Sequence, residues 1–234
     1  MLEGLFRRRR LPHWDAEDAT YFITTCLAGS IPAQGLMRLQ QFRETLELKP
    51  RPIGLSLDEW EARKHKLIFA RFDGIIDDEP AVRHLANPLA ASEVESSLRH
   101  FAGERYDLLG FVVMPSHFHW IFHPRANWVQ SCIEKSRQDG KPDTRTPRQR
   151  IMQSVKGYSA HQCNRLLDLY GEFWQDESYD HVIRNDNELF RIIQYVENNP
   201  VKAGLVSRCE DWLWSSARVR VRLGIPYGQP LPAE

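Results

Sequence analysis

Several short segments of this chain have the apolar pattern of β-strands. Residues 21–27 combine aromatic and β-branched side chains, and residues 106–113 are almost continuously apolar. Residues 117–123 follow Pro115, which cannot donate a hydrogen bond to a strand ladder, so the chain must turn or bulge there. We predict that these last two segments pair as adjacent antiparallel strands, and that residues 178–184 form a further strand.

Longer segments carry apolar residues at helical spacing. Two of them begin with recognisable caps, since Ser56 and Glu59 form a capping-box pair, and Asn87 stands before Pro88 at the first helical position. Pro200 is expected to end the last helix, because the residue before a proline is pushed out of helical geometry. The predicted helices span about 34–48, 56–72, 87–102, 146–166 and 185–200.

The order of these elements predicts an α+β fold in a single domain, residues 1–234. An antiparallel sheet would carry helices on one side, with extra helices inserted over residues 34–102. Residues 124–146 are expected to form a hydrophilic, mobile loop, because residues 136–145 contain almost no apolar side chain. This region is also locally basic, so we expect it to contribute affinity for phosphate groups rather than stability.

Composition excludes several classes of protein. The formal net charge is zero, which argues against a general polyanion-coating protein but leaves room for a local basic groove. The four cysteines are widely scattered without Cys-x-x-Cys spacing, so neither a disulfide framework nor a zinc knuckle is indicated. No apolar run approaches the roughly 20 residues of a membrane span, and a reducing cytoplasm fits the cysteine usage.

A His-x-His pair is the first candidate for chemistry. Side chains alternate faces along a strand, so His117 and His119 point the same way, with Phe118 and Trp120 on the other face. Two imidazoles at this spacing can hold one metal ion. Most such pairs are nevertheless surface or packed histidines, so this motif does not decide the matter by itself.

A second stretch strengthens the case for a metal site at these histidines. Tyr195 and Asn199 lie one turn apart on a predicted helix, which places a nucleophile and an oxygen ligand on one helix face. Tyr195 taken alone is more often a packing residue. Tyr179 is the alternative nucleophile, and His123 or His181 could serve as a further ligand or as a residue that orients one.

Three blocks of sequence carry a resemblance to a known family. The segment Val112–His119 resembles the HUH motif (His, hydrophobic, His) of single-tyrosine transposases, and more closely that of the REP-associated tyrosine transposases of bacteria. The segments 173–184 and 195–205 are similar to that family as well, and so are residues 9–22 and 210–217. Ser116 stands where the family more usually has Asn, a change that should not disturb metal binding.

The resemblance implies a fold and a chemistry. The fold would be ferredoxin-like, with His117, His119 and Asn199 binding Mg²⁺ or Mn²⁺ and Tyr195 as nucleophile. The substrate would be single-stranded DNA beside a hairpin formed by a palindromic repeat, cleaved and rejoined through a 5′-phosphotyrosine. The protein would be cytoplasmic, associated with the bacterial nucleoid, without membrane partners, and a monomer or homodimer.

Basic side chains supply candidate DNA contacts, and other functions stay open. The four arginines of residues 7–10 would form either a solvated tail or a phosphate-binding arm. One alternative function is a non-catalytic, sequence-specific binder of repeat DNA with the same fold. Another is a zinc hydrolase using a third histidine, although no glutamate base stands beside the histidines. The candidate DNA contacts are Arg148, Arg150, Lys156 and Lys202.

Overall fold

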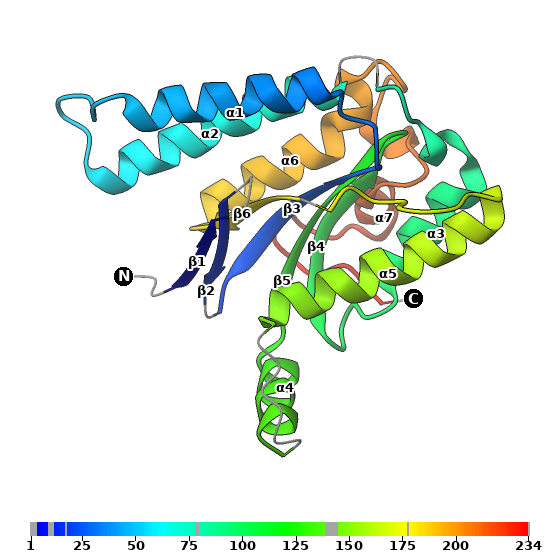
Figure 1. Ribbon diagram of the computed structural model, residues 1–234. Helices are drawn as coiled ribbons and strands as arrows, with labels where there is room; N and C mark the ends of the chain where they lie inside the picture. The colour runs from blue at the N-terminus through cyan, green and yellow to red at the C-terminus, as the bar shows by residue number, and fades with distance from the viewer. Residues whose placement is uncertain are drawn as a thin grey trace.

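The computed structural model describes residues 4–8, 12–16, 18–77, 80–138, 145–176 and 178–233. At its centre is a four-stranded antiparallel sheet in the order β4-β5-β3-β6 (Figure 1). Each strand matches a predicted segment to within one residue at either end, and the antiparallel pairing of β4 with β5 is confirmed. The strands are β3 (Thr20–Cys26), β4 (Tyr106–Val113), β5 (His117–Pro124) and β6 (Tyr179–Ile183).

The connections produce a β-α-β-β-α-β topology around this sheet. Because all neighbouring strands are antiparallel, β3 runs parallel to β4, and β5 runs parallel to β6, so each of these pairs needs a crossover. The first crossover contains α1 (Ala33–Leu48), α2 (Leu57–Asp77) and α3 (Pro88–Arg99), and the second contains α4 (Ala126–Gln138) and α5 (Pro147–Leu167). This arrangement confirms the expected α+β, ferredoxin-like class.

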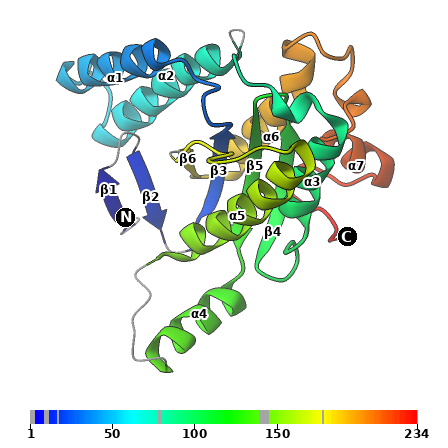
Figure 2. The ribbon, with the colours of Figure 1, turned by 45° about the vertical axis from the view of Figure 1, so that its right-hand side comes forward.

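One face of the sheet is covered by α3 and α5, which pack against each other (Figure 2). Strand residues that point to this face include Tyr21 and Ile23 of β3 and Phe118 and Trp120 of β5. They join buried residues of both helices, for example Val94 in α3, in one apolar core. The alternation predicted for the histidine strand is therefore present, since its aromatic residues are buried here.

The opposite face is also covered, so the prediction of helices on one side of the sheet was incomplete. Phe22 of β3 and Ile121 of β5 point to this second face. They pack with α6 (Asp186–Lys202) and with the hairpin formed by α1 and α2, which lies alongside α6 (Figure 1). The inserted helices were expected from the sequence, but their docking against α6 depends on contacts far apart in the chain.

The segment 124–146 is not one loop, and this prediction is corrected. Helix α4 occupies residues 126–138, followed by residues 139–144, which lie outside the described part of the chain. Trp128 and Cys132 are spaced one helical turn apart; Cys132 is buried and Trp128 packs on the core. The strongly hydrophilic composition that suggested a loop begins only at Ser136, after most of the helix.

The ends of the helices follow their caps, with one correction. The capping pair of Ser56 and Glu59 is present at the start of α2, and Asn87 caps α3. Helix α6 does not end before Pro200 but continues to Lys202. Proline is tolerated there because the missing N–H affects one bond in the last turn.

The remaining elements are small. Strands β1 (Gly4–Arg8) and β2 (Pro12–Ala16) form a separate two-stranded sheet that the sequence pattern did not predict. Arg9 and Arg10 of the basic run lie outside the described residues. Among the described residues, no helix combines the length and apolar character that crossing a membrane requires. The other elements are η1 (His84–Ala86), η2 (Cys209–Asp211) and α7 (Ser216–Leu223).

Candidate functional site

His117 and His119 lie side by side on β5 and face α6. Their ring centroids are 4.7 Å apart, and both side chains are almost completely buried. In each ring Nδ1 is held by a hydroxyl: Ser116 Oγ lies 3.0 Å from Nδ1 of His117, and Thr24 Oγ1 lies 2.7 Å from Nδ1 of His119. A hydrogen bond at Nδ1 fixes the ring and leaves Nε2 to act as a ligand.

Burial keeps both imidazoles neutral. Desolvation lowers the pKa of His117 from 6.5 to about 3, helped by the positive charge of Lys202. The pKa of His119 is also well below its usual value, first because of burial and then because of the charges of His117 and Lys202. A metal ion binds the neutral form of imidazole, so this environment favours ligation over ion pairing.

Helix α6 brings Tyr195 and Asn199 to the histidines. Asn199 Nδ2 donates a hydrogen bond to the Tyr195 hydroxyl at 3.1 Å and lies 3.4 Å from Nε2 of His119. The Tyr195 and His119 rings are 5.6 Å apart, and the Tyr195 ring packs edge-on against Phe69 of α2. The predicted one-turn spacing therefore places the Tyr195 hydroxyl, the Asn199 amide and the His119 imidazole within a single cluster.

Two buried polar atoms in this cluster have no hydrogen-bond partner among the described residues. They are Nε2 of His117 and Oδ1 of Asn199. A buried donor or acceptor without a partner is costly and needs an explanation, and both atoms are of the type that ligates divalent ions. His117, His119 and Asn199 thus fit a metal site with two nitrogen ligands and one oxygen ligand, which leaves positions open for phosphate and water.

The structure adds a residue that the sequence interpretation missed. Asp73 of α2 is buried, accepts a hydrogen bond from the Tyr195 hydroxyl, and forms an ion pair with Lys202 at 2.5 Å. A signal was available, because Asp73 is four residues after Phe69 and lies within the apolar stripe of its helix. A carboxylate at such a position is buried when the helix docks and must then find partners.

The alternative residues have other partners. Tyr179, the alternative nucleophile, is buried, donates to the backbone oxygen of His65, and stacks on Phe72, so its ring packs in the core. His181 is bonded to Glu188. His123 contacts Asp18 and Thr20 at the far end of β5. In the described part of the chain no cluster of three or more His, Cys, Asp or Glu residues could hold a metal, which removes the three-histidine zinc site.

The candidate DNA contacts separate into buried and accessible residues. Arg148 is 4% exposed and forms a buried ion pair with Asp180, so its assignment as a DNA contact was wrong. Lys156 donates to the backbone oxygens of residues 175 and 176 and ties that loop to α5. Arg150 lines a basic hollow between α4 and α5, and the half-exposed Lys202 lies beside Tyr195.

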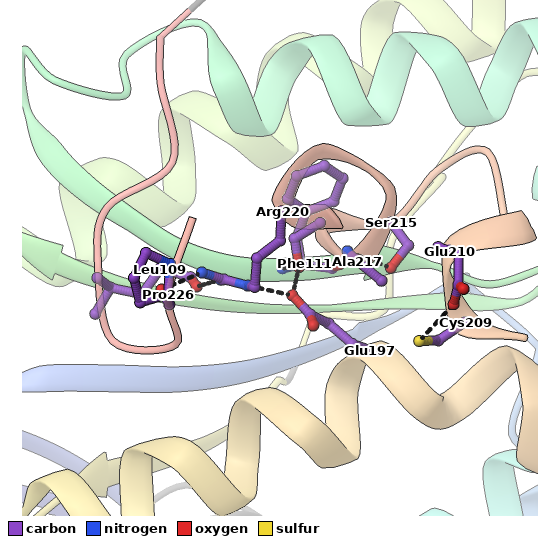
Figure 3. A network of polar contacts seen from close by, with 10 residues as sticks. Leu109, Phe111, Glu197, Cys209, Glu210, Ser215, Ala217, Arg220 and Pro226 are labelled. Atoms are coloured by element: carbon purple, nitrogen blue, oxygen red, sulfur yellow. Dashed lines mark hydrogen bonds and ion pairs between the residues drawn. The ribbon is translucent and has the colours of Figure 1, made fainter. Parts of the chain in front are cut away.

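Helix α6 is fixed from behind by a buried polar network (Figure 3). Oε1 of Glu197 accepts hydrogen bonds from Ser216 at 2.7 Å and from Nε of Arg220 at 3.0 Å. Arg220 also donates to the backbone oxygens of Leu109 in β4 and Pro226. A helix held in this way gives Tyr195 a rigid support, which a precisely placed nucleophile requires.

Comparisons with known proteins give the following similarities. No protein-family model matches the chain. By sequence, the chain is similar to the REP-associated tyrosine transposase of Escherichia coli (strain K12), with 25% identity over 120 residues, 51% of this chain and 59% of the relative. It is similarly related to a Haemophilus influenzae protein of the same family name, with 25% identity over 113 residues, 47% of this chain and 58% of the relative. The chain therefore spans somewhat more than half the length of these curated relatives.

The fold has a solved counterpart as well. A structure of a REP-associated tyrosine transposase bound to a REP hairpin matches with a TM-score of 0.51 and 16% identity, covering 99% of this chain and 94% of that chain. At this low sequence identity, the match shows similarity of the fold alone. The resemblance seen in the sequence is confirmed, and the fold is that of the REP-associated tyrosine transposases.

Proposed function

We propose that this protein is a metal-dependent transposase or nickase that cleaves and rejoins single-stranded DNA beside hairpin repeats. The observation that carries the proposal is the cluster in which the Tyr195 hydroxyl, the Asn199 amide and two neutral imidazoles meet. Similarity to REP-associated tyrosine transposases, one of them bound to a REP hairpin, supports the choice of substrate.

The cofactor in this proposal is Mg²⁺ or Mn²⁺, held by His117, His119 and Asn199. When bound, it would neutralise charge on the scissile phosphate and orient that phosphate for in-line attack. Thr24 keeps the Nε2 atom of His119 directed at the site through its bond to Nδ1.

Tyr195 performs the covalent step. Its phenolic oxygen forms a bond to phosphorus while the bond between phosphorus and the 3′ oxygen breaks. The tyrosine proton passes to an acceptor beside the hydroxyl, and the departing 3′ oxygen takes a proton from water and becomes a free hydroxyl. The product is a 5′-phosphotyrosine that conserves the bond energy, so the same 3′ hydroxyl or another can attack it and restore a DNA strand.

A groove on the outer side of α6 supplies a path for the DNA strand. It has a volume of about 490 Å³, and Tyr195 forms part of its wall. Arg191 and Lys202 bring positive charge for phosphates, and Tyr227 offers an aromatic ring for base stacking. Gln194 lies on the same wall, which makes it a candidate hydrogen-bond partner for a base edge.

The test is a search for the covalent intermediate. Labelled hairpin oligonucleotides carrying single-stranded flanks are incubated with protein and Mn²⁺, denatured, and separated by electrophoresis. We expect a denaturation-resistant adduct that maps to Tyr195 by mass spectrometry and disappears in Tyr195→Phe. Tyr179→Phe is the matched control, because it removes a hydroxyl from the alternative tyrosine, and it should retain the adduct.

Two results would contradict the proposal. An adduct that survives Tyr195→Phe would place the nucleophile elsewhere. Hairpin DNA that wild type binds but never cuts, across several repeat sequences, would instead favour the non-catalytic binder of repeat DNA.

A further inference from the structure

Asp73 reaches the nucleophile from outside the sheet framework. It belongs to the α1–α2 hairpin, an insertion between β3 and α3 that lies along α6 (Figure 1). Its Oδ1 accepts the hydrogen bond donated by the Tyr195 hydroxyl, and its Oδ2 accepts from Lys202 Nζ at 2.5 Å. The carboxylate is 5% exposed and is surrounded by the apolar residues that dock α2.

A purely structural role explains this arrangement poorly. Burying a carboxylate carries a desolvation penalty that one ion pair often fails to offset, and Lys202 is itself half-exposed. A tyrosine hydroxyl can be satisfied by a neutral acceptor, such as the backbone oxygen that Tyr179 uses. The charge on Asp73 therefore points to chemistry rather than to packing.

The hydrogen bonds around Tyr195 are oriented for attack. Asn199 Nδ2 donates to the phenolic oxygen, and the phenolic proton is directed at Asp73. A tyrosine with an ordinary pKa near 10 carries its proton at neutral pH, so an acceptor in direct contact assists the attack.

We propose that Asp73 is a catalytic residue that receives the phenolic proton of Tyr195 during DNA cleavage. The role rests on the proposed function. As the Tyr195 oxygen bonds to phosphorus, its proton moves to Oδ1 of Asp73. The electron pair of the broken bond leaves with the 3′ oxygen, which takes a proton from water and becomes a hydroxyl. In rejoining, the phenolic oxygen departs and takes the same proton back from Asp73.

Lys202 has a supporting position in this scheme. Its ammonium reaches Asp73 on one side and the groove beside Tyr195 on the other. It balances the charge of the buried carboxylate and lies where the phosphates of a strand in the groove would pass. The α1–α2 hairpin is thereby assigned a function, which is to complete the active site with an acid–base group.

The test compares three variants of α2. Asp73→Asn keeps the size of the side chain and removes its basicity, Asp73→Glu keeps a carboxylate, and Asp58→Asn is the matched control, an exposed aspartate at the start of the same helix. Each is assayed with the labelled hairpin oligonucleotide and Mn²⁺ for the rates of adduct formation and rejoining. Hairpin binding and melting temperature are measured in parallel.

We expect Asp73→Asn to slow adduct formation by about 100-fold or more, the usual contribution of a general base, with hairpin affinity unchanged. Rejoining should slow as well, because the same proton returns in the reverse step. Asp73→Glu should retain more activity than Asp73→Asn although it disturbs packing more, and Asp58→Asn should match wild type. If Asp73 had only a structural role, Asp73→Asn would be the more active variant, because it disturbs the packing less. Asp73→Glu therefore tests the proposal even if Asp73→Asn folds poorly.

The outcomes separate the two proposals. If wild type forms the adduct and Asp73→Asn forms it at the same rate, the role of Asp73 is overturned and the proposed function stands. The same conclusion follows if Asp73→Glu is no more active than Asp73→Asn. If wild type forms no adduct with any hairpin, the proposed function fails and the role of Asp73 fails with it.

Discussion

Thr24 and Thr25 are neighbours on β3 that point to opposite faces of the sheet, and both are fully buried. Thr24 Oγ1 is bonded to Nδ1 of His119, whereas Thr25 Oγ1 has no hydrogen-bond partner among the residues that the structure describes. Replacing each by valine removes one hydroxyl, keeps a β-branched side chain, and leaves the strand ladder intact. A comparison of the two variants therefore measures what the hydrogen bond between Thr24 and His119 contributes.

The two substitutions should change stability in opposite directions. Thr24→Val leaves the buried Nδ1 atom of His119 without this partner, which costs about 1–3 kcal/mol. Thr25→Val removes an unsatisfied polar group from an apolar core, so it should be neutral or stabilising by about 1 kcal/mol. Each kcal/mol corresponds to roughly 2–4 °C in melting temperature for a protein of this size.

Metal binding should be weakened by only one of the two substitutions. Loss of the hydrogen bond that orients a ligating histidine lowers metal affinity by roughly 10–100-fold. We therefore expect Mn²⁺ titration calorimetry to show weakened binding for Thr24→Val and wild-type binding for Thr25→Val. Thermal unfolding without metal gives the stability change separately. Equal Mn²⁺ affinity in both variants would refute the reasoning that Thr24 orients a ligand, whatever the melting temperatures show.

Three further predictions test the site and its corrections. His119→Ala should abolish Mn²⁺ binding measured by calorimetry, whereas His123→Ala should not. If both variants lose Mn²⁺ binding to the same extent, the metal site does not lie where we propose. Arg148→Met, which breaks a buried ion pair, should lower the free energy of unfolding by about 3–5 kcal/mol without changing the salt dependence of DNA binding. Arg150→Ala should reduce the slope of log DNA affinity against log salt concentration by about one, with little change in stability. If instead Arg148→Met reduces this slope and Arg150→Ala does not, Arg148 is a DNA contact after all. Burial first, and then the positive charges of His181, Arg184 and Lys64, lower the pKa of His65 from 6.5 to about 4, against the opposing effect of Glu61. Since the unfolded chain binds this proton at higher pH than the folded protein, stability should fall as pH drops from about 6.5 toward 4, by at most about 3 kcal/mol. His65→Gln should flatten that part of a denaturation–pH profile, and an unchanged slope would exclude His65 as its source.

Local patterns in the sequence determined most of the elements and half of the candidate site. Strand alternation placed His117 and His119 on one face, and helical spacing placed Tyr195 and Asn199 on another. Capping residues marked the starts of α2 and α3, since a cap acts within one turn of chain. These features depend on neighbours a few residues apart, so they can be predicted without a tertiary structure.

Tertiary packing decided the properties that depend on distant partners. Arg148 looked like a DNA contact because its charge is visible in the sequence, but its partner Asp180 is 32 residues away. Asp73 meets Tyr195 across 122 positions, and Thr24 meets His119 across 95. Burial sets the cost of each charge and the pKa of each histidine, and burial exists only after the helices dock on both faces of the sheet. The sequence by itself thus determined which residues could act, and the docking of α2 and α6 determined which of them share a site.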